Sequence, residues 1–191
     1  MIRSLWSFWG LVAALSTFGA VFAVGAERQR AALQAATAPI QEGETLTFSQ
    51  AIDGDTVLLA TEGGERVTVR LVGIKAFDRD GKDAVSGFGQ SSMDALARAL
   101  TNNPIRAELF DPPLDSRGRT LATLYVNDAD VGLGLVREGL VLVYTAHPFP
   151  AVGAYLEEQA HAQQARRGVW GNAEAAERAL ALAREWRARR T

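Results

Sequence analysis

The chain has 191 residues, of which 48% are hydrophobic and 22% charged, and its formal net charge is -2. These values lie in the range of globular proteins and exclude wholesale disorder. The absence of cysteine excludes disulfides and thiolate metal sites. Residues 46–170 carry 16 acidic and 12 basic side chains, a balance of -4 that argues against tight non-specific binding to polyanions.

The first 26 residues are predicted to form an export segment. The stretch from Leu5 to Ala26 carries no charge, and as a helix it would extend over about 33 Å, enough for a hydrocarbon core of about 30 Å. Its length, with Trp6 and Trp9 near one end, favours a retained membrane anchor, and the small residues near Ala26 also suit a cleaved signal peptide. A buried helix is the least favoured alternative. Both export alternatives place the following domain outside the cytoplasm, at the cell membrane or in the periplasm.

Residues 27–44 are predicted to be a linker, and residues 45–170 a single α+β domain. Five runs are strand-like, over residues 45–52, 56–61, 66–74, 105–110 and 119–126. In the third, Val67, Val69 and Leu71 alternate with polar residues, the period-2 pattern of a half-buried strand. Helical spacing of apolar residues predicts a helix over residues 91–101, and Asp130 as cap with Gly139 as stop predicts a short helix over residues 130–138. A further helix is predicted over residues 152–167. Five short strands with inserted helices suit a small closed barrel, which has no free edge.

Residues 171–191 are predicted to form an extra C-terminal helix. Asn172 can cap it, and an apolar stripe follows at helical spacing: Ala176, Ala179, Leu180, Ala183 and Trp186. We expect this stripe to dock on the domain, with binding of a protein partner or self-association as the alternative.

Five motifs occur in the order and spacing of a known family. They are Ala51–Val57 (AIDGDTV), Val69–Ile74 (VRLVGI), Asp115–Arg119 (DSRGR), Leu135–Leu140 (LVREGL) and Ala165–Trp170 (ARRGVW). Through these motifs the chain resembles the staphylococcal nuclease (thermonuclease) family over residues 45–170. The resemblance implies a five-stranded OB-fold barrel with packed helices, and hydrolysis of nucleic-acid phosphodiesters with a calcium ion.

The resemblance also implies roles for individual residues. Asp55 matches a metal carboxylate, and a hard cation such as calcium prefers oxygen ligands. Arg70 and Arg119 match two phosphate-binding arginines, whose guanidinium groups stabilise charge on phosphate oxygens. Asp53 and Thr56 complete the supporting turn. The backbone carbonyl of Ala76 matches a further metal ligand.

Two positions depart from the family pattern. Lys75 stands where the family has its second metal carboxylate, and like charges ~4 Å apart cost about 4 kcal/mol at an effective dielectric of ~20. Asp78 stands where the family has a glutamate base, and a catalytic group misplaced by ~1 Å can lose activity ~100-fold. The two changes together predict lost or altered catalysis. For Lys75 we favour an ion pair with Asp55 over an ammonium that replaces the metal in an active site.

The predicted function is a binding or scaffold module derived from a nuclease. The alternative is an active phosphodiesterase that acts on extracytoplasmic DNA or RNA. No cofactor is expected, or calcium if the protein is active. The expected partners are the membrane through the N-terminal helix, a phosphate or nucleic acid at Arg70 and Arg119, and a protein at the C-terminal helix. The two arginines have a purely structural alternative, in which they pair with Asp53, Asp78 or Asp115.

Overall fold

The computed structural model describes residues 40, 41, 43–81 and 85–188 of the chain. The predicted anchor or signal segment, residues 1–26, lies outside the described residues. Within the described residues, no helix is long and apolar enough to cross a membrane.

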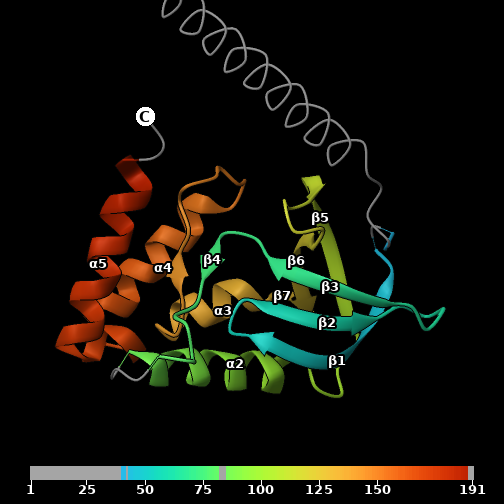
Figure 1. The fold of residues 1–191 in the computed structure, drawn as a ribbon, viewed down its shortest axis with the longest axis horizontal. Helices are drawn as coiled ribbons and strands as arrows, with labels where there is room; N and C mark the ends of the chain where they lie inside the picture. The colour runs from blue at the N-terminus through green and yellow to red at the C-terminus, as the bar shows by residue number, and fades with distance from the viewer. Residues whose placement is uncertain (1–39, 42, 82–84, 189–191) are drawn as a thin grey trace, which may run out of the picture.

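Five strands form a closed barrel, seen in the right half of Figure 1. Antiparallel pairing joins them in the order β3-β2-β1-β5-β6, and a parallel pairing of β3 with β6 closes the ring. The short strand β7 continues from β6 as a hairpin. The bounds are β1 Thr45–Asp53, β2 Thr56–Ala60, β3 Arg66–Leu71, β5 Ile105–Leu114, β6 Thr120–Val126 and β7 Ala129–Asp130.

A second pair of strands and the helices lie beside the barrel. The strands β4 (Ile74–Lys75) and β8 (Leu142–Val143) pair antiparallel. Figure 1 shows α2 running beneath the barrel, with α4 and α5 on the opposite side of β4 from the barrel strands. The helical bounds are α2 Ser86–Leu100, α3 Val131–Arg137, α4 Val152–Gln164, the 3-10 helix η1 Gly168–Gly171 and α5 Ala173–Ala188.

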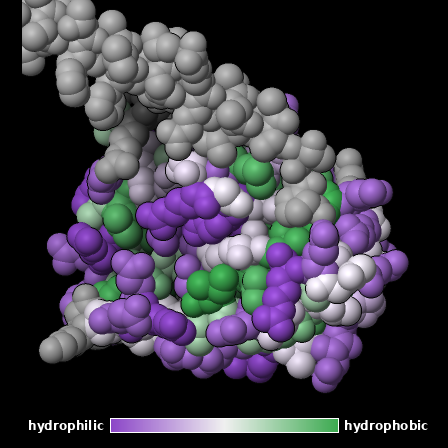
Figure 2. Space-filling model, turned by 45° about the vertical axis from the view of Figure 1, so that its right-hand side comes forward, coloured by the Kyte–Doolittle hydropathy of each residue, from purple (hydrophilic) through white to green (hydrophobic). Residues whose placement is uncertain are grey.

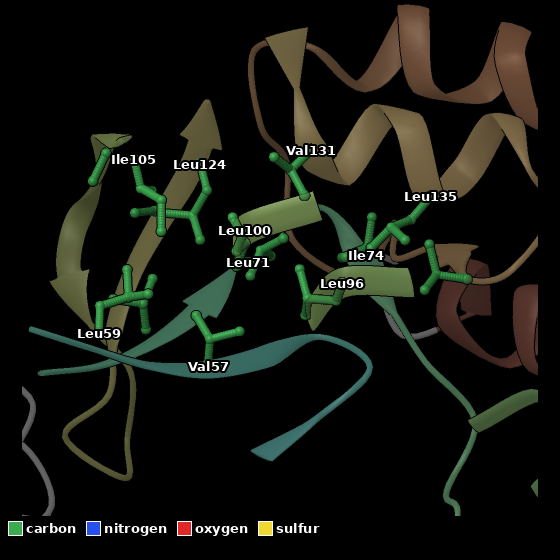
Figure 3. Packing of buried hydrophobic residues seen from close by; sticks show 14 of the residues in the cluster. Val57, Leu59, Leu71, Ile74, Leu96, Leu100, Ile105, Leu124, Val131 and Leu135 are labelled. Atoms are coloured by element: carbon green, nitrogen blue, oxygen red, sulfur yellow. The ribbon is translucent and has the colours of Figure 1, made fainter. Parts of the chain in front are cut away.

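The core fills the barrel and the space between the barrel and α2 and α3. In Figure 3 side chains from β2, β3, β5 and β6 converge on Leu96 and Leu100 of α2, both fully buried. Burying a leucine stabilises a fold by about 1.5–3 kcal/mol. Along β3 the odd-numbered residues point into this core, so Arg70 lies on the outer face of the barrel, as its alternation predicts.

The expected α+β barrel with packed helices is confirmed, and several elements differ in detail from the prediction. The predicted strand over residues 66–74 is interrupted at Val72 and Gly73 and continues as β4. The predicted strand over residues 105–110 extends to Leu114 as β5, with a shift of register between Leu109 and Leu114. The helix α2 begins five residues before the predicted start at Ser91, because its first turns contain glycines that weaken the helical pattern.

The extra C-terminal helix is present as α5 and docks on the domain. Its buried face consists of Ala175, Ala179 and Trp186, with Leu182 packed against the same cluster. Ala179 and Trp186 of the predicted stripe are therefore buried as expected, whereas Leu180 is 46% exposed. On the face shown in Figure 2, hydrophobic residues form separate patches among hydrophilic ones.

Candidate functional site

Asp55 lies in the tight turn between β1 and β2, and its side chain is fully buried. Asp53 Oδ1 accepts the backbone N–H of Asp55 at 2.9 Å, which holds the turn. Gly54 is required because a Cβ there would lie 2.0 Å from Ser92 Oγ on α2. The turn is thus pressed onto α2.

The Asp55 carboxylate has four donors. Oδ1 accepts from Arg70 Nη1 and from the Thr56 hydroxyl, the latter at 3.0 Å. Oδ2 accepts from the Ala76 backbone N–H at 3.0 Å and from Lys75 Nζ at 3.4 Å. The expected ion pair of Lys75 with Asp55 is therefore present. The structural alternative in which Arg70 pairs with Asp53 is wrong, because Arg70 pairs with Asp55.

The strand register brings these donors together. Thr56 and Arg70 are opposite each other in the β2–β3 pair. Gly73, with φ +77, allows the chain to leave β3 and enter β4, and a Cβ there would lie 2.5 Å from the Phe149 ring. The strand β4 then places Lys75 beside the Asp55 carboxylate.

Arg119 lies immediately before β6 and joins the same constellation. Its Nε donates to Asp115 Oδ2 at 2.7 Å, and its Nη2 lies 2.6 Å from the same oxygen in an ion pair. Its Nη1 donates to Thr56 Oγ1 at 3.4 Å. The structural alternative for Arg119, a pair with Asp115, is therefore present. Thr56 also connects Arg119 to Asp55, so the two arginines border one site.

Burial, neighbouring charges and hydrogen bonds shift the pKa of three carboxyl groups of the site. Burial by itself would raise the pKa of Asp55, but Arg70, Lys75 and the Ala76 N–H outweigh it and lower that pKa below its ordinary value. Burial and the charge of Asp55 raise the pKa of Asp53. For Asp115 the hydrogen bonds from Arg119 and Arg117 outweigh burial and lower the pKa.

Three cationic side chains of the site reach solvent. The exposed fraction is 15% for Arg70, 36% for Lys75 and 21% for Arg119. An arginine has five N–H donors, so the ion pairs leave donors free for an oxyanion. A phosphate could therefore be bound at the outer side of the pairs, with Asp55 behind them.

Asp78 is not part of this constellation. Its side chain is exposed and makes no hydrogen bond or ion pair with Asp55, Arg70, Lys75 or Arg119. The backbone at Asp78 is fixed by α2, because a Cβ on Gly89 would lie 2.4 Å from the Phe77 carbonyl oxygen and 2.9 Å from the Asp78 carbonyl carbon.

The residues at Asp55 do not fit a calcium ion. Calcium takes six to eight oxygen ligands. Both Asp55 oxygens already accept from two donors each, and Lys75 Nζ brings a positive charge to Oδ2. No group of three or more histidine, cysteine, aspartate or glutamate residues in the described part of the chain could hold a metal ion.

Three features of the site were not predicted from the sequence. They are the packing of Ser92 and Gly89 of α2 against the site segments, the bridging hydroxyl of Thr56, and the Ala76 N–H as a donor. Asp115, which pairs with Arg119, is the first residue of the Asp115–Arg119 motif, and that motif could have indicated its role. His147, beside Tyr144 with ring centroids 5.8 Å apart, is exposed.

Comparison with known proteins gives consistent matches. Residues 68–172 match the family described as staphylococcal nuclease homologue. The chain is 28% identical to a thermonuclease of Staphylococcus intermedius over 130 residues, 67% of this chain and 77% of the relative. It is 28% identical over 132 residues to an uncharacterized endonuclease of Haemophilus influenzae, 69% of each protein. A thermonuclease of Staphylococcus hyicus is 27% identical over 131 residues, 68% of this chain and 77% of the relative. The family resemblance seen in the motifs is thereby confirmed.

Proposed function

Because the chain belongs to the staphylococcal nuclease homologue family, we propose that it is a phosphate-binding module of nuclease descent that does not use calcium. The observation that carries this proposal is the contact of Lys75 Nζ with Asp55 Oδ2. An ammonium group stands against the carboxylate that a calcium ion would need. The exposed position of Asp78 agrees with the loss of a general base at this point.

The ligand class follows from the side chains that remain accessible. Arg70, Lys75 and Arg119 offer charge-assisted N–H donors, which suit the oxygens of a phosphate monoester or diester. Asp55 and Asp115 balance part of their charge, and the domain as a whole is acidic. We therefore expect weak binding of single-stranded nucleic acid, with a dissociation constant of about 10⁻⁴ to 10⁻⁶ M.

An active phosphodiesterase is the second candidate. Arg70 and Arg119 border one site in the structure, and two of the relatives are named thermonucleases and one an endonuclease. In this alternative, Lys75 would supply the positive charge that stabilises the phosphate oxygens.

The location proposed for this module is extracytoplasmic. The uncharged stretch from Leu5 to Ala26 supports an N-terminal membrane anchor, with a cleaved signal peptide as the alternative. A protein partner at the C-terminal helix also belongs to this proposal. Its site would be the outer face of α5, where Leu180 is exposed.

The proposal is tested with the full-length protein and labelled single- and double-stranded DNA and RNA, incubated with calcium and with chelator. We expect no cleavage above background in either condition. Cleavage that chelator abolishes would overturn the proposal. Cleavage that survives chelator and disappears in Lys75→Ala would establish the second candidate in a metal-free form.

Binding is measured in the same preparation by fluorescence anisotropy of a short labelled single-stranded oligonucleotide. Arg119→Gln should weaken binding and reduce the slope of log affinity against log salt by about 0.7. The matched control is Arg117→Gln, since Arg117 lies in the same turn with an exposed side chain. Equal effects of the two variants would contradict a phosphate site at Arg119.

A further inference from the structure

The docking of α5 creates a second apolar cluster, separate from the barrel core. We call it the C-terminal cluster, and its buried members are Val85, Leu142, Val169, Ala175, Ala179 and Trp186. Partly buried side chains that pack against it include Phe77 and Tyr144. The cluster therefore joins α5 to the start of α2, to β8 and to the segment that follows β4.

This cluster contacts the chain on both sides of Lys75. Leu142, a buried member, is the register partner of Lys75 in the β4–β8 pair. Phe77, two residues after Lys75, packs against the cluster. Tyr144 also packs against it, and its backbone N–H donates to the Gly73 carbonyl at 2.8 Å. The residues that pair with or flank the Lys75 segment therefore belong to, or pack against, the cluster that includes α5.

The β4–β8 pair has little stability of its own. Each strand has only two residues, and isolated two-stranded pairs are marginal at best in water. Its placement must come from packing on neighbouring elements. On one side Gly89 of α2 presses against the backbone at Phe77, and on another α5 packs through the C-terminal cluster.

Trp186 is the largest buried side chain that α5 contributes. It is 6% exposed, and its ring meets the Tyr144 ring edge-on with centroids 4.9 Å apart. Asn172 Oδ1 caps the helix by accepting the Ala175 N–H at 3.0 Å. The contact with Tyr144 fixes the last turn of α5 beside the end of β8, and the Asn172 cap fixes its first turn.

We propose that Trp186 is a positioning residue for the phosphate site. Through Tyr144, Leu142 and Phe77 it holds β4 so that Lys75 Nζ and the Ala76 N–H meet Asp55. Trp186 itself touches no ligand. Its effect on phosphate binding rests on the proposed function above, whereas its effect on the position of Lys75 does not.

The lysine content of the chain allows a direct test. Lys75 and Lys82 are the only lysines, so full-length protein labelled with 13C-lysine gives two side-chain signals. Lys75→Arg identifies the Lys75 signal by its loss. In Trp186→Ala we expect the Lys75 signal to move toward the free-lysine position. Oligonucleotide affinity should fall roughly five- to tenfold, as when one of several phosphate contacts is weakened.

Two variants separate positioning from general stability. Trp186→Phe keeps a ring against Tyr144, so its Lys75 signal and its oligonucleotide affinity should be close to those of the unmodified protein. Leu156→Ala removes an exposed leucine from α4 and should change neither. All spectra are recorded well below each variant's melting temperature. Should Trp186→Ala not fold, Trp186→Leu is measured against the same expectation.

An unmoved Lys75 signal in a folded Trp186→Ala or Trp186→Leu variant would overturn the proposal. The same holds if Leu156→Ala moves the signal equally. If the unmodified protein binds no oligonucleotide, the proposed phosphate function fails, and the Lys75 signal still decides whether Trp186 sets the position of β4.

Discussion

Asp55 is a fully buried carboxylate, and burying a charge is costly unless partners compensate it. Its two cationic partners differ in their access to water. Arg70 is 15% exposed and Lys75 is 36% exposed, so water screens the second pair more. Arg70 should therefore be the main counter-charge of Asp55, and Lys75 the weaker and more accessible one.

Double-mutant cycles on stability test this ranking. The coupling energy between Asp55 and Arg70, from Asp55→Ala, Arg70→Ala and the double variant, should be about 3 kcal/mol because both groups are mostly buried. The coupling between Asp55 and Lys75 should be about 1 kcal/mol. Urea unfolding measures both. Zero coupling between Asp55 and Lys75 would show that the 3.4 Å contact contributes nothing to the fold.

The two aspartates of the turn should respond to pH with opposite signs. The pKa of Asp55 is lowered from 3.8, so its stabilising contribution is present above pH 3.8 and is lost as the pH falls through the folded pKa. The pKa of Asp53 is raised from 3.8 by burial and by Asp55. Its contribution is present below pH 3.8 and is lost as the pH rises through the folded pKa.

Asparagine substitutions measure these contributions. Asp55→Asn should lose about 3 kcal/mol at pH 7, and the difference from the unmodified protein should shrink as the pH falls below 3.8. Asp53→Asn keeps an oxygen for the Asp55 N–H and should raise the melting temperature at pH 7. Thermal unfolding from pH 7 to pH 3 compares them. A loss of equal size in both variants at pH 7 would contradict the opposite shifts.

At the level of elements, the local sequence pattern predicted which helices and strands exist better than it predicted where each of them begins and ends. The alternation of Val67, Val69 and Leu71 placed Arg70 on the outer face, because strand periodicity needs no knowledge of the partner strand. The start of α2 was missed because Gly87 and Gly89 oppose helix formation locally. Tertiary packing explains Gly89, since only a glycine fits against the backbone of Phe77.

Most contacts between helices and strands could not be predicted from the sequence. Motif positions pointed to Asp55, Arg70 and Arg119, but the bridge from Arg119 through Thr56 depends on strand register. Register is a property of the assembled sheet and is not encoded in a single strand. In the buried stripe of α5, Ala179 and Trp186 were predicted correctly, but Ala175 was missed and Leu180 is exposed. Alanines occur around much of the helix and leave its orientation ambiguous.

At the level of the whole molecule, charge limits what the phosphate site can do. The domain carries more carboxylates than cations, so long-range attraction of a polyanion is weak. Binding must come from the local donors on Arg70, Lys75 and Arg119. A site of this kind binds a ligand that is already held nearby better than a ligand in dilute solution. Attachment of the protein to a membrane would raise the effective concentration of a ligand held at the same membrane.

Membrane attachment is the last prediction, and it depends on the uncharged stretch from Leu5 to Ala26. We expect the full-length protein to fractionate with membranes and to resist carbonate extraction, because about 20 apolar residues suffice for a spanning helix. Leu11→Arg with Leu15→Arg should release it, since a charged residue near the helix centre costs about 2.5–3.5 kcal/mol. Recovery of a soluble chain that begins near Val24 or Glu27 would show a cleaved signal peptide instead. Equal retention of the arginine variant would show that another part of the protein holds it at the membrane.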